Sequence, residues 1–392
     1  MIRLAEVQDT SQIKDLWSYC FDDTPKFIDF FFQSCYQPEN TLVVVEDGKI
    51  QSCLQLLPYR MMLREREVSV PYIVGVSTWP EFRGQGMVRQ LLQFAHEILQ
   101  ERNIHLSILL PFQYDFYRKY GWEICYDFLR YRGVKYPSHL SLRYSTESKH
   151  PHRRFKKIDL NRDIEKLSVC YDKYMKRFHG YIIRNRKEWI KVIRDVELDQ
   201  GVCYLYEEEK NPLGYILYTM QARNLVISEL VYTTVQAKFA LLELALSHTG
   251  QIDQIDRKAP SCDLDYLYMK DSRGKLEKET FVMGRIHNII GALSGLPYLG
   301  ECFIIQVEDC FYKNNNGRFL IDQKDGMTFV VKTNQKPHVI MDIRTLNQLL
   351  WGYLQPAAAL EEGRNINLLD KKQISNLTQL FPKKHNYMTE IY

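Results

Sequence analysis

The residues best suited to chemistry begin with a glycine-bearing turn. An apolar run at 72–79 passes through Pro80 into the sequence Arg83-Gly84-Gln85-Gly86-Met87-Val88, and an amphipathic helical pattern follows over 87–100. A strand that enters a helix this way leaves backbone N–H groups free where the helix dipole adds partial positive charge. Glycines let a phosphate approach the backbone closely. The pattern predicts a phosphate or pyrophosphate site, although a tight turn with a solvated arginine has the same local sequence.

A second candidate group is aromatic and follows the next apolar run, at residues 106–110. Tyr117 stands four residues before Gly121-Trp122, with Tyr114 and Tyr120 about one turn away. A phenol with an ordinary pKa of about 10 stays protonated at neutral pH and can donate a proton. Because the chain has 26 tyrosines, simple packing is the alternative role for each of them.

Composition limits the class of protein. The chain has 392 residues, which indicates two or three domains, and its 45% hydrophobic and 26% charged residues are typical of a globular protein. The net charge of +4 is not concentrated in one run, so we expect no nucleic-acid partner; the basic cluster at 153–157 is interpreted as a solvated face.

The cysteine and histidine patterns, and the start of the chain, narrow this further. Nine scattered cysteines favour reduced thiols in a cytoplasmic protein, and ten histidines show no metal-ligand spacing, so we predict no metal. The N-terminus lacks an apolar signal region, and no uncharged apolar run approaches about 18 residues, so no membrane partner is expected.

The glycine turn and the aromatic segment together resemble the GNAT acetyltransferases. Their cofactor loop reads Arg/Gln-x-x-Gly-x-Gly/Ala, which here is Arg83-x-x-Gly86-x-Val88, without the last small residue. The segment Tyr117-x-x-x-Gly121-Trp122 also matches. Within that family the chain is most similar to the Eis-like (enhanced intracellular survival) N-acetyltransferases, which tolerate a bulky residue at the position of Val88.

The resemblance extends along nearly the whole chain and predicts an α+β fold with three domains. Residues 1–150 form the catalytic GNAT domain, with helices near 10–21 and 26–35 and strands at 41–46, 49–57, 61–70 and 123–131. Residues 151–285 form a degenerate GNAT-like domain, and residues 286–392 a sterol-carrier-protein-like α/β domain. A polar stretch at 145–151 is the expected linker.

The second domain is expected to hold no cofactor. Its strand at 226–232 and helix at 236–247 occupy the places of the cofactor strand and helix, but the connection is Thr233-Thr234-Val235, with no glycine. β-Branched residues are poor at special backbone angles and crowd a phosphate.

The resemblance also implies a chemistry and its residues. Acetyl-CoA is the co-substrate, held by the backbone of Val76 and Thr78 and by Arg83, Gly84, Gln85, Gly86, Met87 and Val88. Tyr117 is the general acid and the C-terminal carboxylate of Tyr392 the base, with Asp22, Asp23 or ordered water as alternative bases. Phe21, Asp23 and Glu390 are the expected substrate-binding residues.

The expected acceptor is a cationic amine, either an aminoglycoside-like small molecule or a lysine-like amine in a peptide. Eis-like proteins are hexamers, so a homo-oligomer is expected by resemblance. The second functional hypothesis is a noncatalytic protein that binds an acyl-CoA or lipid through its C-terminal domain. An intact glycine turn and Tyr117 favour the enzyme.

Overall fold

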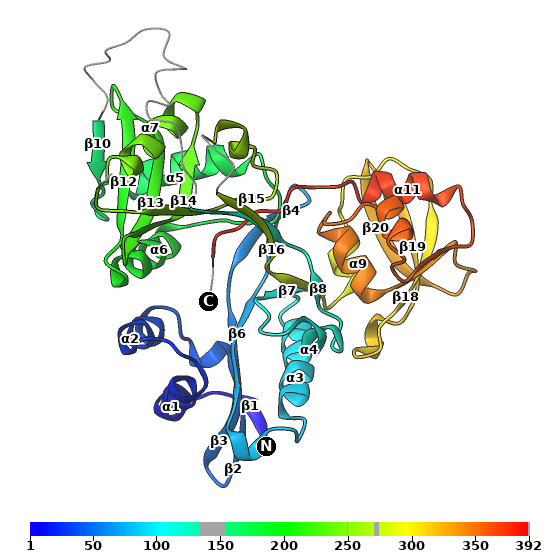
Figure 1. The fold of residues 1–392 in the computed structure, drawn as a ribbon. Helices are drawn as coiled ribbons and strands as arrows, with labels where there is room; N and C mark the ends of the chain where they lie inside the picture. The colour runs from blue at the N-terminus through cyan, green and yellow to red at the C-terminus, as the bar shows by residue number, and fades with distance from the viewer. Residues whose placement is uncertain (134–153, 249, 270–273, 391–392) are drawn as a thin grey trace. The chain divides into compact units, whose positions relative to one another are not determined.

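The computed structural model describes residues 1–133, 154–248, 250–269 and 274–390, which form two compact units (Figure 1). The first unit combines Met1–Tyr126 with Phe281–Asn386, and the second combines Asp127–Thr280 with Tyr387–Glu390. Each unit mixes helices and sheet, as expected for an α+β fold. The expected linker at 145–151, the domain boundary at residue 150 and the terminal Tyr392 lie outside the described residues.

The N-terminal part of the first unit is built on a seven-stranded sheet of order β1-β2-β3-β6-β7-β17-β8. The strands are β1 Ile2–Leu4, β2 Thr41–Glu46, β3 Lys49–Leu57, β6 Tyr72–Thr78, β7 Leu106–Leu109, β17 Met283–Ile286 and β8 Glu123–Ile124. Helices α1 (Thr10–Cys20) and α2 (Pro25–Ser34) lie on one face, and α3 (Met87–Glu101) and α4 (Tyr114–Arg118) on the other (Figure 1).

Successive side chains of a strand point to opposite faces of the sheet, so the hydrophobic core has two layers, one on each face. On β3, Cys53 packs with α1, whereas Leu54 and Leu56 pack with α3. Helix α1 contributes Ile13 and Leu16 to its layer, both fully buried. The sheet is therefore covered on both faces, and β6 lies at its centre.

The expected single strand at 61–70 is instead a hairpin of β4 (Arg60–Leu63) and β5 (Arg66–Ser69). Arg64 and Glu65 form its turn with φ of 50° and 61°. The buried guanidinium of Arg64 donates hydrogen bonds to the carbonyls of Leu349 and Leu350. These carbonyls end helix α9, where the Leu349 carbonyl also accepts from the N–H of Gly352, so the arginine adds side-chain hydrogen bonds to the last turn of the helix.

The C-terminal part of the first unit contains its own helices and a separate five-stranded sheet of order β20-β19-β18-β21-β22. Its strands are β18 Phe303–Glu308, β19 Gly317–Lys324, β20 Met327–Thr333, β21 Val339–Asp342 and β22 Ile366–Leu368. Its helices are α8 Ile289–Leu293, α9 Ile343–Leu350, α10 Pro356–Glu361 and α11 Gln373–Leu380.

The second unit has its own seven-stranded sheet, of order β10-β12-β13-β14-β15-β9-β16. The strands are β9 Asp127–Arg132, β10 Arg154–Lys157, β12 Val202–Glu208, β13 Asn211–Gln221, β14 Asn224–Tyr232, β15 Gln254–Pro260 and β16 Lys275–Thr280. The unit also contains the short β11 Tyr181–Ile182, which is not part of this sheet. The helices are α5 Ile164–Met175, α6 Arg186–Leu198 and α7 Val235–Leu246.

Two strands cross between the expected domains. The expected strand at 123–131 is divided: β8 belongs to the first sheet, whereas β9 pairs with β15 and β16 in the second. Conversely, β17, at the end of the expected second domain, pairs with β7 and β8 of the first sheet. The pairing of β9 with β16 includes the salt bridges Arg130–Glu279 and Arg132–Glu277. The compact units therefore differ from consecutive blocks divided at 150 and 285.

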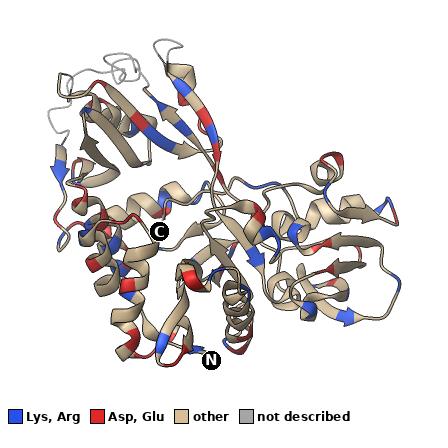
Figure 2. Cartoon of the chain, turned by 60° about the horizontal axis from the view of Figure 1, so that its bottom comes forward, with Lys and Arg blue, Asp and Glu red and all other residues tan. Residues whose placement is uncertain are grey.

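Basic and acidic residues are interspersed along the described parts of both units (Figure 2). No described helix is long and apolar enough to cross a membrane. Across these same residues, no group of three or more His, Cys, Asp or Glu side chains is placed to hold a metal ion.

Candidate active site

Strand β6 opens away from its neighbour at the site. Its parallel pairing with β7 consists of Tyr72 with Ile108 and Ile73 with Leu109, and the strand continues to Thr78 beyond that pairing. Its register with β3 also shifts near Gly75, which has a φ of +61°. The backbone from Val76 to Thr78 therefore offers an edge that an extended ligand can pair with.

Gly75 is required by a close approach as well as by its backbone angle. A Cβ built at this position would lie 2.5 Å from the ring of Trp17 and 2.9 Å from Nε2 of Gln55. Both Gln55 side-chain atoms lack a hydrogen-bond partner among the described residues, although the residue is 1% exposed. The glycine thus lets α1 close against the bulged part of β6.

The turn after β6 has the geometry of an anion site. Gly84 and Gly86 have φ of +78° and +79°, and a Cβ on either would meet nothing within 4 Å. Gly86 is the N-cap of α3 and supplies no side-chain hydrogen bond to the helix. The first N–H groups of α3 therefore remain available to a phosphate, in the field of the helix dipole.

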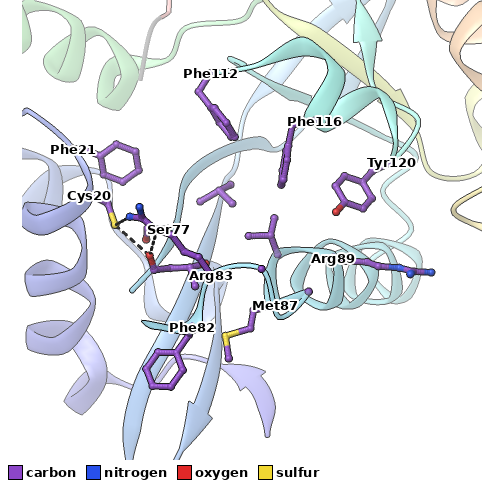
Figure 3. Close-up of a pocket in the computed structure, with 15 residues that line it drawn as sticks. Cys20, Phe21, Ser77, Phe82, Arg83, Met87, Arg89, Phe112, Phe116 and Tyr120 are labelled. Carbon is purple, nitrogen blue, oxygen red and sulfur yellow. Dashed lines mark hydrogen bonds between the residues drawn. The ribbon is translucent and has the colours of Figure 1, made fainter. Parts of the chain in front are cut away.

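A cavity of about 750 Å³ lies beside this turn and beside the open edge of β6 (Figure 3). It is lined by Cys20, Phe21, Val76, Ser77, Thr78, Phe82, Arg83, Gly84, Gly86, Met87, Val88, Arg89, Phe112, Phe116 and Tyr120. Phe112 and Phe116 project into it from the segment after β7, with Phe21 on the opposite wall (Figure 3). The lining thus combines two exposed guanidinium groups at the phosphate end with aromatic walls.

Arg83 joins the turn to the open strand. Its Nε donates to the carbonyl of Thr78 at 3.1 Å, and its NH2 group lies 3.8 Å from Sγ of Cys20 (Figure 3). The guanidinium is held across the end of β6, where its charge complements that of a pyrophosphate.

Tyr117 lies in α4 and is only 3% exposed. Its ring contacts two lining residues, with centroids 5.6 Å from Phe112 and 5.1 Å from Phe116. Burial raises the pKa of Tyr117, so the phenol keeps its proton at neutral pH. Tyr120, which the sequence left as an alternative, lines the cavity itself.

The face of β6 covered by α1 and α2, here named the acceptor side, carries the next predicted residues. Phe21 lines the cavity, and Asp23 accepts a hydrogen bond from Nε1 of Trp17 at 2.8 Å. The Trp17 ring is itself stacked on Phe31, with centroids 4.4 Å apart. The indole thus orients a half-buried carboxylate close to the aromatic wall.

The structure brings most of the predicted cofactor residues together. Seven of the eight line the cavity, whereas the side chain of Gln85 donates to the carbonyl of Glu81 at 3.2 Å. Glu390 lies in the second unit, where its carboxylate is paired with Arg184. Sequence reasoning missed the lining residues Cys20, Ser77, Phe82, Arg89, Phe112 and Phe116. Cys20, Phe112 and Phe116 lie outside the strand–turn–helix stretch and reach the cavity through chain folding, which no local motif marks.

The family comparisons agree with this geometry. Residues 1–125 and residues 180–286 each match a family described as Acetyltransferase (GNAT) domain, and residues 289–389 match the Sterol carrier protein domain. No curated protein matches the chain.

Several solved structures share the whole fold. A conserved protein of unknown function from Enterococcus faecalis, described as a probable N-acyltransferase, has a TM-score of 0.85 and 22% identity over 100% of this chain and 99% of its own. A GCN5-related N-acetyltransferase from Anabaena variabilis has a TM-score of 0.84 and 20% identity, and Eis1 from Mycobacterium abscessus 0.76 and 15%, each over 100% of both chains.

The chain is therefore a GNAT acetyltransferase. It contains two GNAT domains followed by a sterol carrier protein domain, so the expected order of three parts and the α+β fold class are confirmed. Its likeness to Eis1 extends over both full chains and is a likeness of fold, in agreement with the Eis-like resemblance.

Proposed function

We propose that the chain transfers the acetyl group of acetyl-CoA to a cationic amine of a small molecule or peptide. The observation that carries this is the cavity, which joins an uncapped helix N-terminus and Arg83 to the unpaired edge of β6. The first two features suit a pyrophosphate, and the strand edge suits an amide-bearing arm. Acetyl-CoA carries both groups.

The reaction forms a C–N bond and breaks a C–S bond, while the amine loses a proton and the thiolate gains one. Tyr117 is proposed as the proton donor to the thiolate, since burial keeps its phenol protonated. The terminal carboxylate of Tyr392 is proposed as the base on the family resemblance. Phe21, Asp23 and Glu390 are the proposed acceptor residues; the Asp23 carboxylate, oriented by Trp17, suits a cationic amine.

The lipid-binding alternative is not favoured by the one cavity described in the C-terminal domain. The cavity of about 360 Å³ found there is lined by Gly317, Arg318, Lys332, Thr333 and Asn334, which are polar or charged apart from the glycine. A lipid tail requires an apolar lining.

An amine panel with detection of released CoA tests the proposal. We expect turnover with cationic amines, and in Asp23→Asn a higher KM for the amine with an unchanged KM for acetyl-CoA. Asp29→Asn is the matched control, because Asp29 is exposed on α2 and pairs with Lys14. A folded protein that binds acetyl-CoA but releases no CoA with any amine overturns the proposal.

A further inference from the structure

The last described residues of the chain, Tyr387–Glu390, belong to the second unit. The backbone N–H of Tyr387 donates to the carbonyl of His179 at 3.1 Å. Its ring packs on Phe178 and Tyr174, with centroids 5.1 and 6.5 Å away. The tail therefore packs on the end of α5 and on the segment that follows it.

One buried arginine holds the end of this tail. The Arg184 side chain is 1% exposed, and its Nε donates to Oε1 of Glu390 at 2.8 Å. Its NH1 and NH2 groups bind the carboxylate of Glu229, and NH2 also donates to Oγ1 of Thr389 at 2.7 Å. Thr389 in turn donates to Glu229. The tail is thus joined to β14 by a closed network of hydrogen bonds.

Aromatic rings pack on the Arg184 guanidinium and complete the docking site of the tail, here named the seat. The guanidinium carbon lies 4.4 Å from the centroid of Tyr171 and 4.8 Å from that of Trp189. Burial alone would lower the pKa of Arg184, but the two carboxylates outweigh it and raise that pKa, so the arginine stays charged. A buried charge of this kind is costly without its partners.

The seat corresponds to the acceptor side of the first domain. Parallel pairing ends at Ile73 with Leu109 in the first sheet and at Ile227 with Arg257 in the second. Two residues later stand Gly75 in β6 and Glu229 in β14. Where the first domain brings Trp17 against a glycine, the second therefore carries a carboxylate that holds Arg184.

We propose that the acceptor side of the second domain has become the docking site for the chain's own C-terminal segment, with Arg184 as the positioning residue. This inference rests on the proposed function, in which the terminal carboxylate of Tyr392 is the base. Anchoring at Thr389 and Glu390 restricts the freedom of a carboxylate two residues further on. It also gives Arg184 and Trp189 a role in a domain that lacks the cofactor turn.

The test combines hydrogen exchange with kinetics in the full-length protein. In Arg184→Gln, Glu229 and Glu390 face each other without a counter-charge. We expect the C-terminal peptide from Asn386 onward to exchange at least about tenfold faster. We expect kcat to fall on the order of tenfold through lost orientation, with the KM for acetyl-CoA unchanged. Arg184→Lys should give an intermediate result, because an ammonium keeps the charge but cannot form the bidentate pair.

Two further variants separate docking from general damage. Arg186→Gln removes an exposed arginine of α6 that pairs with Glu165, and it should change neither exchange nor kcat. Glu390→Ala keeps the pair between Arg184 and Glu229, so the second domain stays folded while the tail loses an anchor. Faster hydrogen exchange of the C-terminal peptide in Glu390→Ala supports docking even if Arg184→Gln does not fold.

Unchanged exchange of the tail in a folded Arg184→Gln protein overturns the proposal. Faster exchange with full kcat overturns the positioning role. Adding residues after Tyr392 then separates the two proposals. If the extended protein loses turnover, the terminal base survives and only the role of Arg184 is lost. If it keeps full turnover, the terminal base fails as well.

Discussion

The two GNAT domains differ at the start of the helix in the strand–turn–helix unit that each contains. In the first, β6 leads to α3 through Gly86, whose φ is +79° and which caps no helix N–H group. In the second, β14 leads to α7 through Thr234, which has a φ of −137° and accepts a hydrogen bond from the N–H of Ala237. One helix start is left open for a ligand, whereas the other is closed by its own side chain.

The central strands repeat the same contrast. Gly75 leaves β6 without a side chain beside the acceptor side, whereas Glu229 fills the matching place in β14 with a carboxylate. A catalytic domain needs empty space lined by polar backbone, and a docking domain needs side chains that satisfy one another. In our proposal, a few residue types at matching positions separate a site for a diffusing substrate from a docking site for the chain itself.

The largest expected effect comes from the chain's end. Adding a few residues after Tyr392 displaces the terminal carboxylate, so turnover should fall by a factor on the order of 10² or more, the usual contribution of one acid–base group. Acetyl-CoA binding should persist, since its proposed contacts lie in the turn before α3. Tyr392→Phe should be mild, because the carboxylate remains. Full activity in the extended protein would remove the terminus from the mechanism.

The next effect concerns the proton donor. Tyr117→Phe keeps the ring but removes the phenolic proton, so kcat should fall by a factor on the order of 10² while the KM for acetyl-CoA changes little. Tyr120→Phe is the matched control, since Tyr120 lines the cavity without being the proposed acid. If the two variants exchange these results, Tyr120 is the donor and the family motif assigns the wrong tyrosine here.

The third prediction tests the open helix start directly. Gly86→Val places a branched side chain in the cavity at a positive φ, so the affinity for acetyl-CoA should fall by about tenfold or more, or about 1.4 kcal/mol. Gly48→Val is the control for backbone strain, because Gly48 has a φ of +74° and equally open surroundings in the turn between β2 and β3. Calorimetry on both folded variants measures the difference.

Calorimetric stoichiometry sharpens the same comparison. We expect one acetyl-CoA per chain, since the start of α7 is capped by Thr234. Two equivalent binding events would contradict the contrast between the domains.

The sequence predicted the parts of this site that depend on neighbours along the chain. The strand, glycine turn and helix around Gly86 are consecutive, so the pattern located them, and the family resemblance named seven residues there that line the cavity. The hairpin turn at Arg64 and Glu65 was missed because neither residue is a usual carrier of positive φ. The strand pattern near residue 127 gave no indication of which sheet it would join, since pairing with β15 and β16 is decided by distant segments.

Glu390 shows the same limit at the level of one side chain. An acidic residue near the chain's end was predicted to contact the substrate, but its carboxylate meets Arg184, 206 positions away in the sequence. No local pattern connects the two. The role in acceptor binding stays a prediction, and the contact that the structure provides is an ion pair within the second unit.

The smallest expected effect lies at the closed helix start. Thr234→Ala removes the hydroxyl that caps the N–H of Ala237, so thermal or urea unfolding should show a stability loss of about 1 kcal/mol. Acetyl-CoA stoichiometry and affinity should be unchanged, because the freed N–H group still follows Thr233-Thr234 and not a glycine turn. Thr234→Gly is a stronger test of the comparison, since it removes the capping hydroxyl and also lets the backbone adopt a positive φ. If that variant binds a second acetyl-CoA, the cap alone keeps the second domain closed. If it does not, filling of the acceptor side by Glu229 and the tail must contribute to the closure.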